Sequence, residues 1–240
     1  MTPARASGIL PPLPEKRSYV RRMFAAIAPH YDRMNHLMSL GLDRAWRRTA
    51  VRLCQVPAGG RLLDVATGTG DMAWEALRLD STLHVTGLDL TREMMVYGRS
   101  KFPGQSFSLV EGDALALPFR ADTFDAVCSA FMMRNVTDIR AAFAEQARVV
   151  KPGGRVVCLE LTMPQRPLFE WLFRLYFFHV VPALGELVSG QRAAYTYLPE
   201  SVAAFPRPAE LQGIMEEAGL RAVRYRLAML GTVAWHWGIK

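Results

Sequence analysis

The sequence predicts an α/β protein with a doubly wound, mostly parallel sheet, a helical arm before the sheet and a helical insertion within it. From residue 61 onward, short apolar runs alternate with amphipathic segments, the pattern of parallel strands joined by helices. A glycine-rich turn follows the first of these runs. Half of the 240 residues are hydrophobic, which supplies a sizeable core and excludes a disordered chain.

The first 56 residues come before this alternation. Residues 1–15 hold four prolines and no periodic pattern, which predicts a flexible leader that lacks the apolar stretch of a secretory signal. Residues 16–56 predict a helical arm or lid, because Met23, Phe24 and Ile27 share one helical face. Pro29 and Gly41 divide this arm into shorter helices.

Residues 57–240 form the predicted main domain. Strands are expected at residues 61–66, 83–88, 106–110, 124–129 and 155–161. Helices are expected at 71–79, 91–101 and 138–150, with Thr91 as the cap of the second and Lys151-Pro152-Gly153-Gly154 ending the third. A helix over 208–219 and two strands over 220–238 close the domain.

A helical insertion over residues 164–205 interrupts the alternation. Its segment 168–188 is strongly apolar and rich in aromatic residues. Polar residues and a proline divide it too often for a membrane span: Glu170, Arg174, His179, Pro182 and Glu186. Two interpretations stay open, a buried or lid helix and an interfacial helix lying against lipid.

The positive charge is confined to the arm. Residues 1–52 hold ten basic and three acidic residues, which accounts for the whole net charge of +7, whereas residues 61–240 hold nineteen of each. Such an arm is suited to nucleic acid, an anionic membrane surface or an acidic partner, or it is a solvated face without a partner.

The cysteines and histidines predict neither disulfides nor a metal site. Three cysteines lie far apart in the chain, which favours a reducing, cytoplasmic setting. The five histidines show no metal-ligand spacing, so no metal is expected.

The glycine-rich turn predicts a nucleoside site. The run 62–66 leads into Thr67-Gly68-Thr69-Gly70-Asp71 and then a helix, so Gly68 and Thr69 are expected to bring backbone close to a ligand. Asp89 ends the next strand, about 20 residues on, where a carboxylate accepts hydrogen bonds from ribose hydroxyls. Asp113 and Ala114 follow the third strand and are expected at the adenine edge.

Two ligands that contain a nucleoside are candidates for this site. NAD would place a pyrophosphate at the N-terminus of the helix that follows the turn, where Asp71 puts a negative charge. A cationic ligand is therefore favoured, and S-adenosylmethionine is the obvious candidate.

The turn is similar to the first motif of class I S-adenosylmethionine-dependent methyltransferases, which have a Rossmann-like fold. Further motifs resemble the ubiquinone/menaquinone biosynthesis C-methyltransferases, a similarity that spans about residues 20–238. These motifs are F-x6-YD-x-MN-x-LMS-x-G-x2-R-x-WR from Phe24 to Arg47, Arg134-Asn135-Val136-Thr137-Asp138, Lys151-Pro152-Gly153-Gly154, the strand end Leu159-Glu160, His179-Val180-Val181-Pro182 and Tyr195-x-Tyr197-Leu198-x-Glu200-Ser201. The chain departs from the family pattern at Thr67 and at Met132, where the family has glycine.

The resemblance implies methylation of a ring carbon of a polyprenylated quinol, either demethylmenaquinol or the benzoquinol equivalent. Arg134 and Asn135 are the expected catalytic residues, with Tyr31 closing over the ring from the arm. His179 is a further candidate for the base. Met132 adds a bulky thioether beside the expected site, which raises the question of how much room the ring or its tail has.

The alternatives concern both activity and location. Three alternatives stay open: a methyltransferase that acts on a small soluble molecule, a non-catalytic S-adenosylmethionine-binding partner of a quinone-pathway complex, and a nucleic-acid methyltransferase, which charge alone suggests. No nucleic-acid acceptor motif follows the fourth strand. The expected location is cytoplasmic and peripherally membrane-associated, and the oligomeric state, including a homo-oligomer, is left open.

Overall fold

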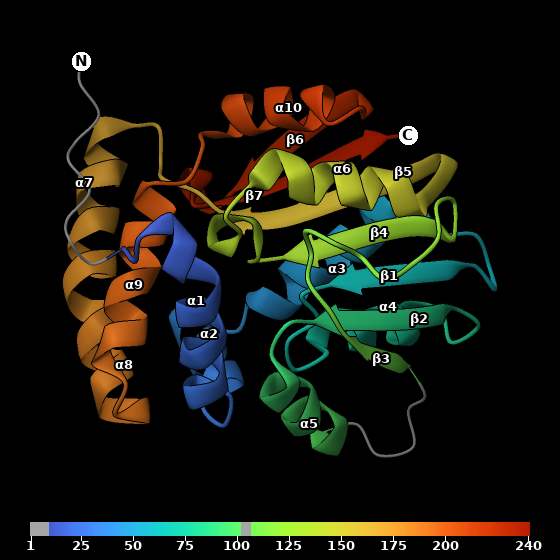
Figure 1. Cartoon of the computed structure of the whole chain (residues 1–240). Helices are drawn as coiled ribbons and strands as arrows, with labels where there is room; N and C mark the ends of the chain where they lie inside the picture. The colour runs from blue at the N-terminus through green and yellow to red at the C-terminus, as the bar shows by residue number, and fades with distance from the viewer. Residues whose placement is uncertain (1–9, 102–106) are drawn as a thin grey trace.

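The computed structural model describes residues 10–101 and 107–240. Within these residues a single seven-stranded sheet runs in the order β3-β2-β1-β4-β5-β7-β6 (Figure 1). Its strands are β1 (Arg61–Val65), β2 (His84–Asp89), β3 (Ser108–Glu111), β4 (Phe124–Ala130), β5 (Val150–Leu161), β6 (Arg221–Ala228) and β7 (Val233–Ile239). The first five pair in parallel, and β7 pairs antiparallel with both β5 and β6. The predicted doubly wound, mostly parallel sheet is confirmed.

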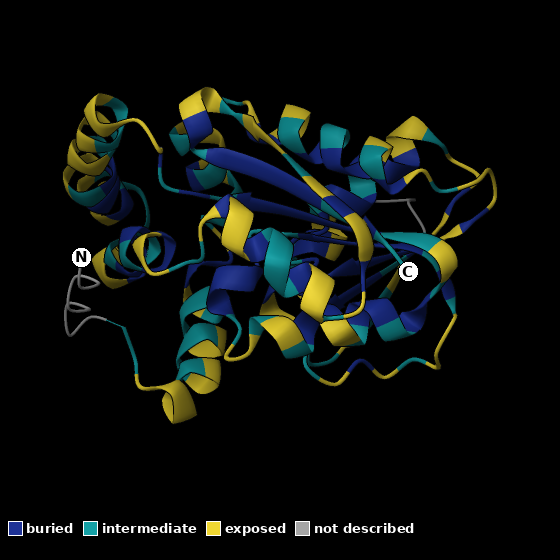
Figure 2. Ribbon diagram, turned by 90° about the horizontal axis from the view of Figure 1, so that it is seen from above, coloured by how far each residue is buried: buried dark blue, intermediate teal, exposed yellow. Residues whose placement is uncertain are grey.

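Helices cover both faces of the sheet because its central strands are apolar on both sides. Leu62 and Leu63 are successive residues of β1, and both are fully buried, one in each of two separate core clusters. Figure 2 shows the strands buried between two layers of helices. The helices of the main domain are α4 (Asp71–Leu79), α5 (Arg92–Lys101), α6 (Ile139–Val149) and α10 (Pro208–Glu217).

The N-terminal residues form three helices, α1 (Leu13–Ile27), α2 (Tyr31–Met38) and α3 (Asp43–Cys54), with breaks at Pro29 and Gly41 as the sequence predicts. α1 starts three residues inside the segment expected to be a leader, because proline is tolerated in the first turn of a helix. Residues 1–9 of that segment lie outside the described residues. α3 differs from a mobile lid, since Ala50, Val51 and Cys54 are buried in a core cluster of the sheet.

The insertion consists of α7 (Pro167–Leu175), a π-helical turn (Tyr176–Val180), α8 (Val181–Ser189) and α9 (Arg192–Ala203). These helices pack against α1 and α2 in a third cluster, which joins Ile27 and Met34 to Phe177, Val181 and Tyr195. Figure 1 shows this helical group at one end of the sheet. Arm and insertion, more than a hundred residues apart in sequence, therefore build one layer together.

One strand begins earlier than predicted. Residues 151–154 were expected only to stop a helix, but β5 already begins at Val150, which pairs with Phe124 of β4. The register shifts between this pair and the next, Ala126 with Arg155, so the intervening residues bulge out of the ladder. Gly153 has a φ of +80° there, which explains why glycine occupies the bulge.

Candidate active site

The carboxyl ends of β1, β2 and β4 meet at the point where the strand order reverses. β1 lies between β2 on one side and β4 on the other. The strands β2 and β3 extend the sheet on the first side, and β4 to β7 extend it on the second. In open α/β sheets, ligands bind in the crevice outside such a switch point. The segments that follow these three strands therefore form the walls of the expected ligand crevice.

The turn after β1 is bound directly to the end of β2. The backbone N–H of Gly68 donates to Asp89 Oδ2 at 2.8 Å, and the N–H of Thr91 donates to Asp89 Oδ1 at 2.7 Å. Burial, opposed by these hydrogen bonds, raises the pKa of Asp89. Gly68 and Gly70 have φ values of +57° and +83°, which glycine adopts without strain. The predicted turn and its acid thus form one unit.

Thr67, the first departure from the family pattern, has a structural role. Its hydroxyl donates to Asp64 Oδ2 at 2.6 Å, and burial raises the pKa of Asp64 to about 7. A Cβ at Gly87 would come within 2.8 Å of the Thr67 side chain, so this glycine makes room for the threonine. The extra side chain therefore faces inward, away from the ligand crevice.

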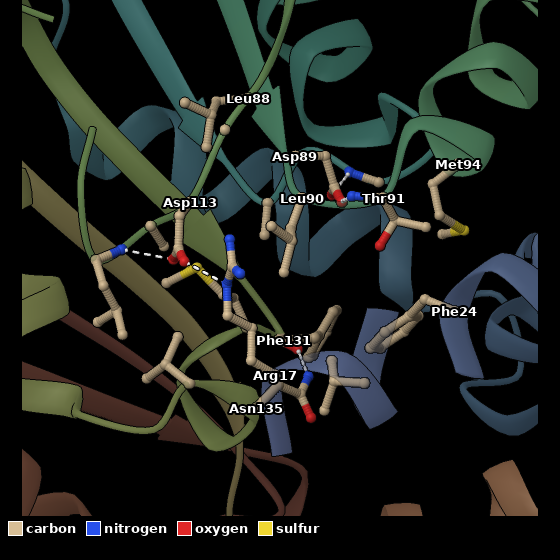
Figure 3. Close-up of a pocket in the computed structure, with 18 of the residues that line it drawn as sticks. Arg17, Phe24, Leu88, Asp89, Leu90, Thr91, Met94, Asp113, Phe131 and Asn135 are labelled. Atoms are coloured by element: carbon tan, nitrogen blue, oxygen red, sulfur yellow. Dashed lines mark hydrogen bonds and ion pairs between the residues drawn. The ribbon is translucent and has the colours of Figure 1, made fainter. Parts of the chain in front are cut away.

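A first cavity opens at this switch point, with about 810 Å³ of empty volume including open solvent. Four of the five predicted cofactor-binding residues line it: Gly68, Asp89, Asp113 and Ala114. Figure 3 shows two of them, Asp89 and Asp113. Apolar side chains complete the walls, among them Leu90, Met94, Leu115 and Met132. Met132 lines this cavity and is absent from the second cavity described below, so the thioether borders the cofactor side of the site.

Thr69, the fifth predicted cofactor-binding residue, does not line the first cavity. Its hydroxyl donates to Asp32 Oδ1 at 2.6 Å and accepts from Lys101 Nζ at 3.0 Å. Lys101 also donates to Asp32 and Asp71, at 2.5 and 2.7 Å. This polar cluster ties α2 to the N-terminus of α4 and the C-terminus of α5, so Thr69 fixes the arm over the turn.

The first cavity fits S-adenosylmethionine better than a dinucleotide. Asp71 lies outside its lining and is paired with Lys101, so the predicted repulsion of a pyrophosphate by Asp71 is not the deciding feature. Among the described residues that line it, the only cation is Arg17, and Arg17 Nε is paired with Asp113 at 2.7 Å. Two carboxylates and apolar walls suit a cationic nucleoside and offer no phosphate anchor.

Helix α1 covers the mouth of the first cavity through two basic residues that the sequence did not single out. Arg17 reaches Asp113 as described, and Lys16 Nζ donates to the carbonyl oxygens of Arg134 and Val136 at 3.0 and 2.8 Å. Part of the arm's positive charge is therefore used inside the protein. Only its general position in a basic arm hinted at this role.

A second, larger cavity lies between the arm and the insertion, with about 1300 Å³ of empty volume including open solvent. Its walls are mainly apolar and aromatic, including Trp46, Phe173, Tyr176, Phe177, Tyr195 and Tyr197. Phe24, Tyr31, Phe131 and Asn135 line both cavities. The two spaces are therefore neighbours that share one wall, the arrangement needed for transfer of a group between two bound molecules.

The predicted catalytic residues lie together at this shared wall or beside it. Arg134 and Asn135 belong to a short 3₁₀ helix, Met133–Asn135, which follows β4, and Tyr31 is the first residue of α2. Asn135 Oδ1 accepts from the hydroxyl of Tyr197 at 3.2 Å, and its Nδ2 donates to the carbonyl of Phe131 at 3.1 Å. These bonds fix the amide between β4 and the insertion.

Arg134 is held by a buried ion pair. Its Nη1 lies 2.5 Å from Glu160 Oε1, and both side chains are almost fully buried. Burial raises the pKa of Glu160, an effect that the Arg134 charge opposes. The nearby acid Asp138 does not take part in this pair, because its Oδ1 caps α6 by accepting from the N–H of Ala141 at 2.9 Å.

Tyr31 is half-buried and forms part of the shared wall. Burial raises the pKa of its hydroxyl, and the neighbouring Arg47 charge acts in the opposite direction. The Phe24 ring packs edge-on against it, with the ring centroids 5.8 Å apart. Tyr31 thus enters the site as a neutral hydroxyl on an aromatic wall.

Asp43 is a site residue that the sequence interpretation missed. Among the described residues that line the second cavity it is the only carboxylate. Its Oδ2 accepts from Arg47 at 2.6 Å, and its Oδ1 accepts from Ser39 at 3.1 Å and lies 3.6 Å from His36 Nδ1. Its place in the N-terminal motif, between Gly41 and Trp46, was the available signal.

His179, the other candidate for the base, is exposed and lines neither cavity. The three cysteines are free and buried. Over residues 10–101 and 107–240, no group of three or more His, Cys, Asp or Glu side chains is placed to hold a metal ion.

Comparison with known proteins agrees with this geometry. The sequence profile of the ubiE/COQ5 methyltransferase family matches residues 13–240. The chain is 47% identical to the demethylmenaquinone methyltransferase of Roseiflexus castenholzii, over 98% of each protein. It is 42% identical to the ubiquinone/menaquinone biosynthesis C-methyltransferase UbiE of Geobacter sulfurreducens, over 95% of this chain and 91% of that one.

Solved structures support the same fold at lower identity. An S-adenosylmethionine-dependent methyltransferase from Thermotoga maritima superposes with a TM-score of 0.66 at 17% identity, over 91% of this chain and 99% of that chain. The family profile and the relatives together favour an enzyme over the non-catalytic partner considered above. The chain therefore belongs to the ubiE/COQ5 methyltransferase family, with S-adenosylmethionine as its cofactor.

Proposed function

We propose that the enzyme methylates a ring carbon of a polyprenylated quinol, converting demethylmenaquinol to menaquinol or acting on the benzoquinol equivalent. The observation that carries this is the shared wall of Phe24, Tyr31, Phe131 and Asn135, which separates the cavity at the switch point from a larger aromatic one. The names of the relatives given above support the same substrate class. The mainly apolar and aromatic lining of the second cavity suits a ring with a hydrocarbon tail better than a small soluble acceptor.

S-adenosylmethionine supplies an activated methyl group, so the protein has to align the ring carbon with it and make that carbon nucleophilic. In this proposal the ring lies against Tyr31 and Phe131, with the acceptor carbon facing the shared wall. Loss of the proton from a ring hydroxyl moves electron density onto the neighbouring carbon, which takes the methyl group as the bond between that methyl and sulfur breaks and S-adenosylhomocysteine leaves. The ring carbon then gives up its own hydrogen as a proton, and the hydroxyl is restored. Arg134 and Asn135 stabilise the developing phenolate, Arg134 by charge and Asn135 by hydrogen bonding.

Asp43 is the proposed acceptor of the hydroxyl proton, directly or through one water. Its carboxylate lies in the wall of the cavity, and Arg47 keeps it oriented. His36, 3.6 Å from Asp43 Oδ1, has a side chain that is 61% exposed, so it offers a route by which the proton reaches solvent. The acid, the imidazole and the solvent thus lie in series.

Replacing Asp43 with asparagine tests this role. The amide keeps the size of the side chain but cannot accept the proton, and the loss of a general base lowers kcat by about 100-fold or more. Binding of S-adenosylmethionine, measured by calorimetry, remains unchanged. Glu75→Gln is the matched control, because Glu75 is also a buried acid, paired with Arg48 of the arm at 3.1 Å, and it lines neither cavity. Equal kcat values for the two variants would contradict the assignment.

We propose further that the enzyme binds the membrane surface peripherally, where a quinol with an isoprenoid tail resides. The helix Pro167–Ser189 is apolar enough to span a bilayer by length and composition, with a mean hydropathy of 1.3 and only 22% of its most apolar window buried. One of its faces packs on the third cluster through Phe177 and Val181. The other exposes large apolar side chains: Leu168, Trp171, Leu172, Leu175, Val180 and Leu187. An amphipathic helix of this kind suits an interfacial position.

The membrane proposal predicts flotation with vesicles that contain anionic lipid, and release by salt. Arg21 and Arg22 are exposed on α1 and contribute about 1 kcal/mol each near an anionic surface, so replacing both with glutamine weakens binding roughly 30-fold. Arg120→Gln combined with Arg140→Gln is the control, because both arginines are exposed on the main domain. Flotation that depends on neither anionic lipid nor salt would refute the proposal.

Deletion of the gene in its host tests the function itself. Mass spectrometry of the extracted quinones is expected to show a species lighter by one methyl group, with the normal quinone restored by a plasmid copy of the gene. The ring of the accumulated species distinguishes a naphthoquinol from a benzoquinol substrate. An unaltered quinone pool would reject the proposed function.

A further inference from the structure

The second cavity has a mouth that can be located from exposure alone. Among the described residues that line this cavity, only Leu40 and Met229 are exposed, at 86% and 47%. Leu40 lies in the turn between α2 and α3, and Met229 in the turn between β6 and β7. These turns are almost 190 residues apart in sequence, and both bring exposed side chains to the wall of the same cavity.

The rim of this mouth is apolar beyond the two lining residues. Leu37, Leu42 and Leu230 are exposed beside them, at 43%, 36% and 63%. Leu40, Met229 and Leu230 have φ values of +51°, +50° and +58°, a backbone conformation that disfavours large side chains and favours glycine. Folding alone gives no reason for large apolar residues at these positions, so a function outside the fold is indicated.

Other residues that line the same cavity have different chemistry. Arg134, Asn135 and Tyr197 are polar, and all three are buried. The cavity thus combines buried polar groups that suit ring oxygens with apolar residues that are exposed at its wall. A molecule with a polar ring and a long hydrocarbon tail fits only with its ring inside and its tail pointing out.

Charge at the rim suits an anionic membrane. Arg44 follows the first turn and Arg226 precedes the second, and both are exposed. Apolar side chains with flanking arginines are the arrangement that favours insertion of a turn among acyl chains beneath anionic headgroups.

We infer that the two turns form a portal through which the isoprenoid tail leaves the cavity directly into the bilayer. Leu40, Met229 and Leu230 insert among the acyl chains, so the tail is covered by protein or lipid along its whole length. This inference rests on the proposed function, because it assigns the tail of that substrate a path. It adds a recognition site for the tail that is separate from the ring site.

Leu40→Gly and Met229→Gly test the portal, alone and combined. Glycine adopts the observed φ values without strain, so these variants lose the side chains and keep the turns. Two substrates are compared, a quinol with a long isoprenoid tail in anionic vesicles and the same ring without a tail in aqueous buffer. The double variant is expected to raise KM for the tailed quinol about tenfold or more. Its kcat and KM for the tailless ring are expected to stay at the wild-type values.

Val96→Ala is the matched control, since Val96 is 63% exposed on α5 and lines neither cavity. An equal loss on both substrates, or no loss on either, would overturn the portal while leaving the proposed function intact. If the wild-type enzyme methylates neither quinol, the proposed function itself fails. The two failures are therefore distinguished in one experiment.

Discussion

Replacement of Arg134 with alanine is expected to lower kcat by about 100-fold to 1000-fold, because the charge that stabilises the phenolate is lost. The same change leaves Glu160 buried without its partner, which costs about 3–5 kcal/mol of the free energy of unfolding. Enzyme kinetics and chemical denaturation measure the two effects separately. Unchanged quinone flux in cells carrying Arg134→Ala would remove Arg134 from the catalytic residues.

A double variant separates catalysis from stability. Arg134→Met combined with Glu160→Gln removes both charges of the buried pair and recovers most of the lost stability. Activity is expected to stay as low as in Arg134→Ala, because neither new side chain carries a charge. Recovery of activity together with stability would mean that Arg134 only holds the fold.

The second large effect concerns Asp89. Its carboxylate lies at the edge of the first cavity and also holds the turn through the N–H groups of Gly68 and Thr91. Loss of hydrogen bonds to a charged acceptor costs about 1.5–3 kcal/mol each, so Asp89→Ala is expected to weaken S-adenosylmethionine binding by about 100-fold or more. Titration calorimetry measures this directly.

The control for Asp89 is Asp80→Asn, at an exposed carboxylate that caps a turn by accepting from Thr82 and lines neither cavity. Its affinity for S-adenosylmethionine is expected to equal that of the wild type. An unchanged dissociation constant for Asp89→Ala would remove Asp89 from the cofactor site and leave it with the turn alone.

The parts of the fold that follow local rules could be predicted from the sequence. The helix expected at residues 71–79 is found at Asp71–Leu79. The short polar side chain of Asp138 caps α6, the helix that begins at the next residue. The contact between the glycine-rich turn and Asp89 also follows from local rules, because the turn after β1 and the acid that ends β2 occupy positions that parallel strands bring together.

Features that depend on distant contacts could not be predicted in this way. The Thr69 hydroxyl forms hydrogen bonds with Asp32 of the arm and with Lys101 of α5, and neither contact can be inferred from the sequence around the turn. Arg134 pairs with Glu160, which is 26 residues away near the end of β5, and not with Asp138, which is four residues away. The folded chain brings the end of β5 next to Arg134, and both side chains of the pair are buried there. Asp43 becomes a cavity residue only when the insertion closes the other wall.

The basic residues of the arm fall into two groups according to their contacts. Lys16, Arg17, Arg47 and Arg48 bind carbonyls or carboxylates within the protein. Arg21, Arg22, Arg33 and Arg44 are exposed and remain for an external surface. The total of +7 therefore combines an internal clamp with the proposed membrane contact, two uses that a net charge cannot separate.

The central claim is transfer of a methyl group to a ring carbon at the wall between the two cavities. Its most direct measurement uses purified enzyme, S-adenosylmethionine with a ¹³C-labelled methyl group and a tailed demethylated quinol in vesicles, with the product examined by nuclear magnetic resonance. The label is expected as a methyl group bonded to a ring carbon, with both ring oxygens unmodified. Label found as a methoxy group, or its absence from the quinol, would contradict the account.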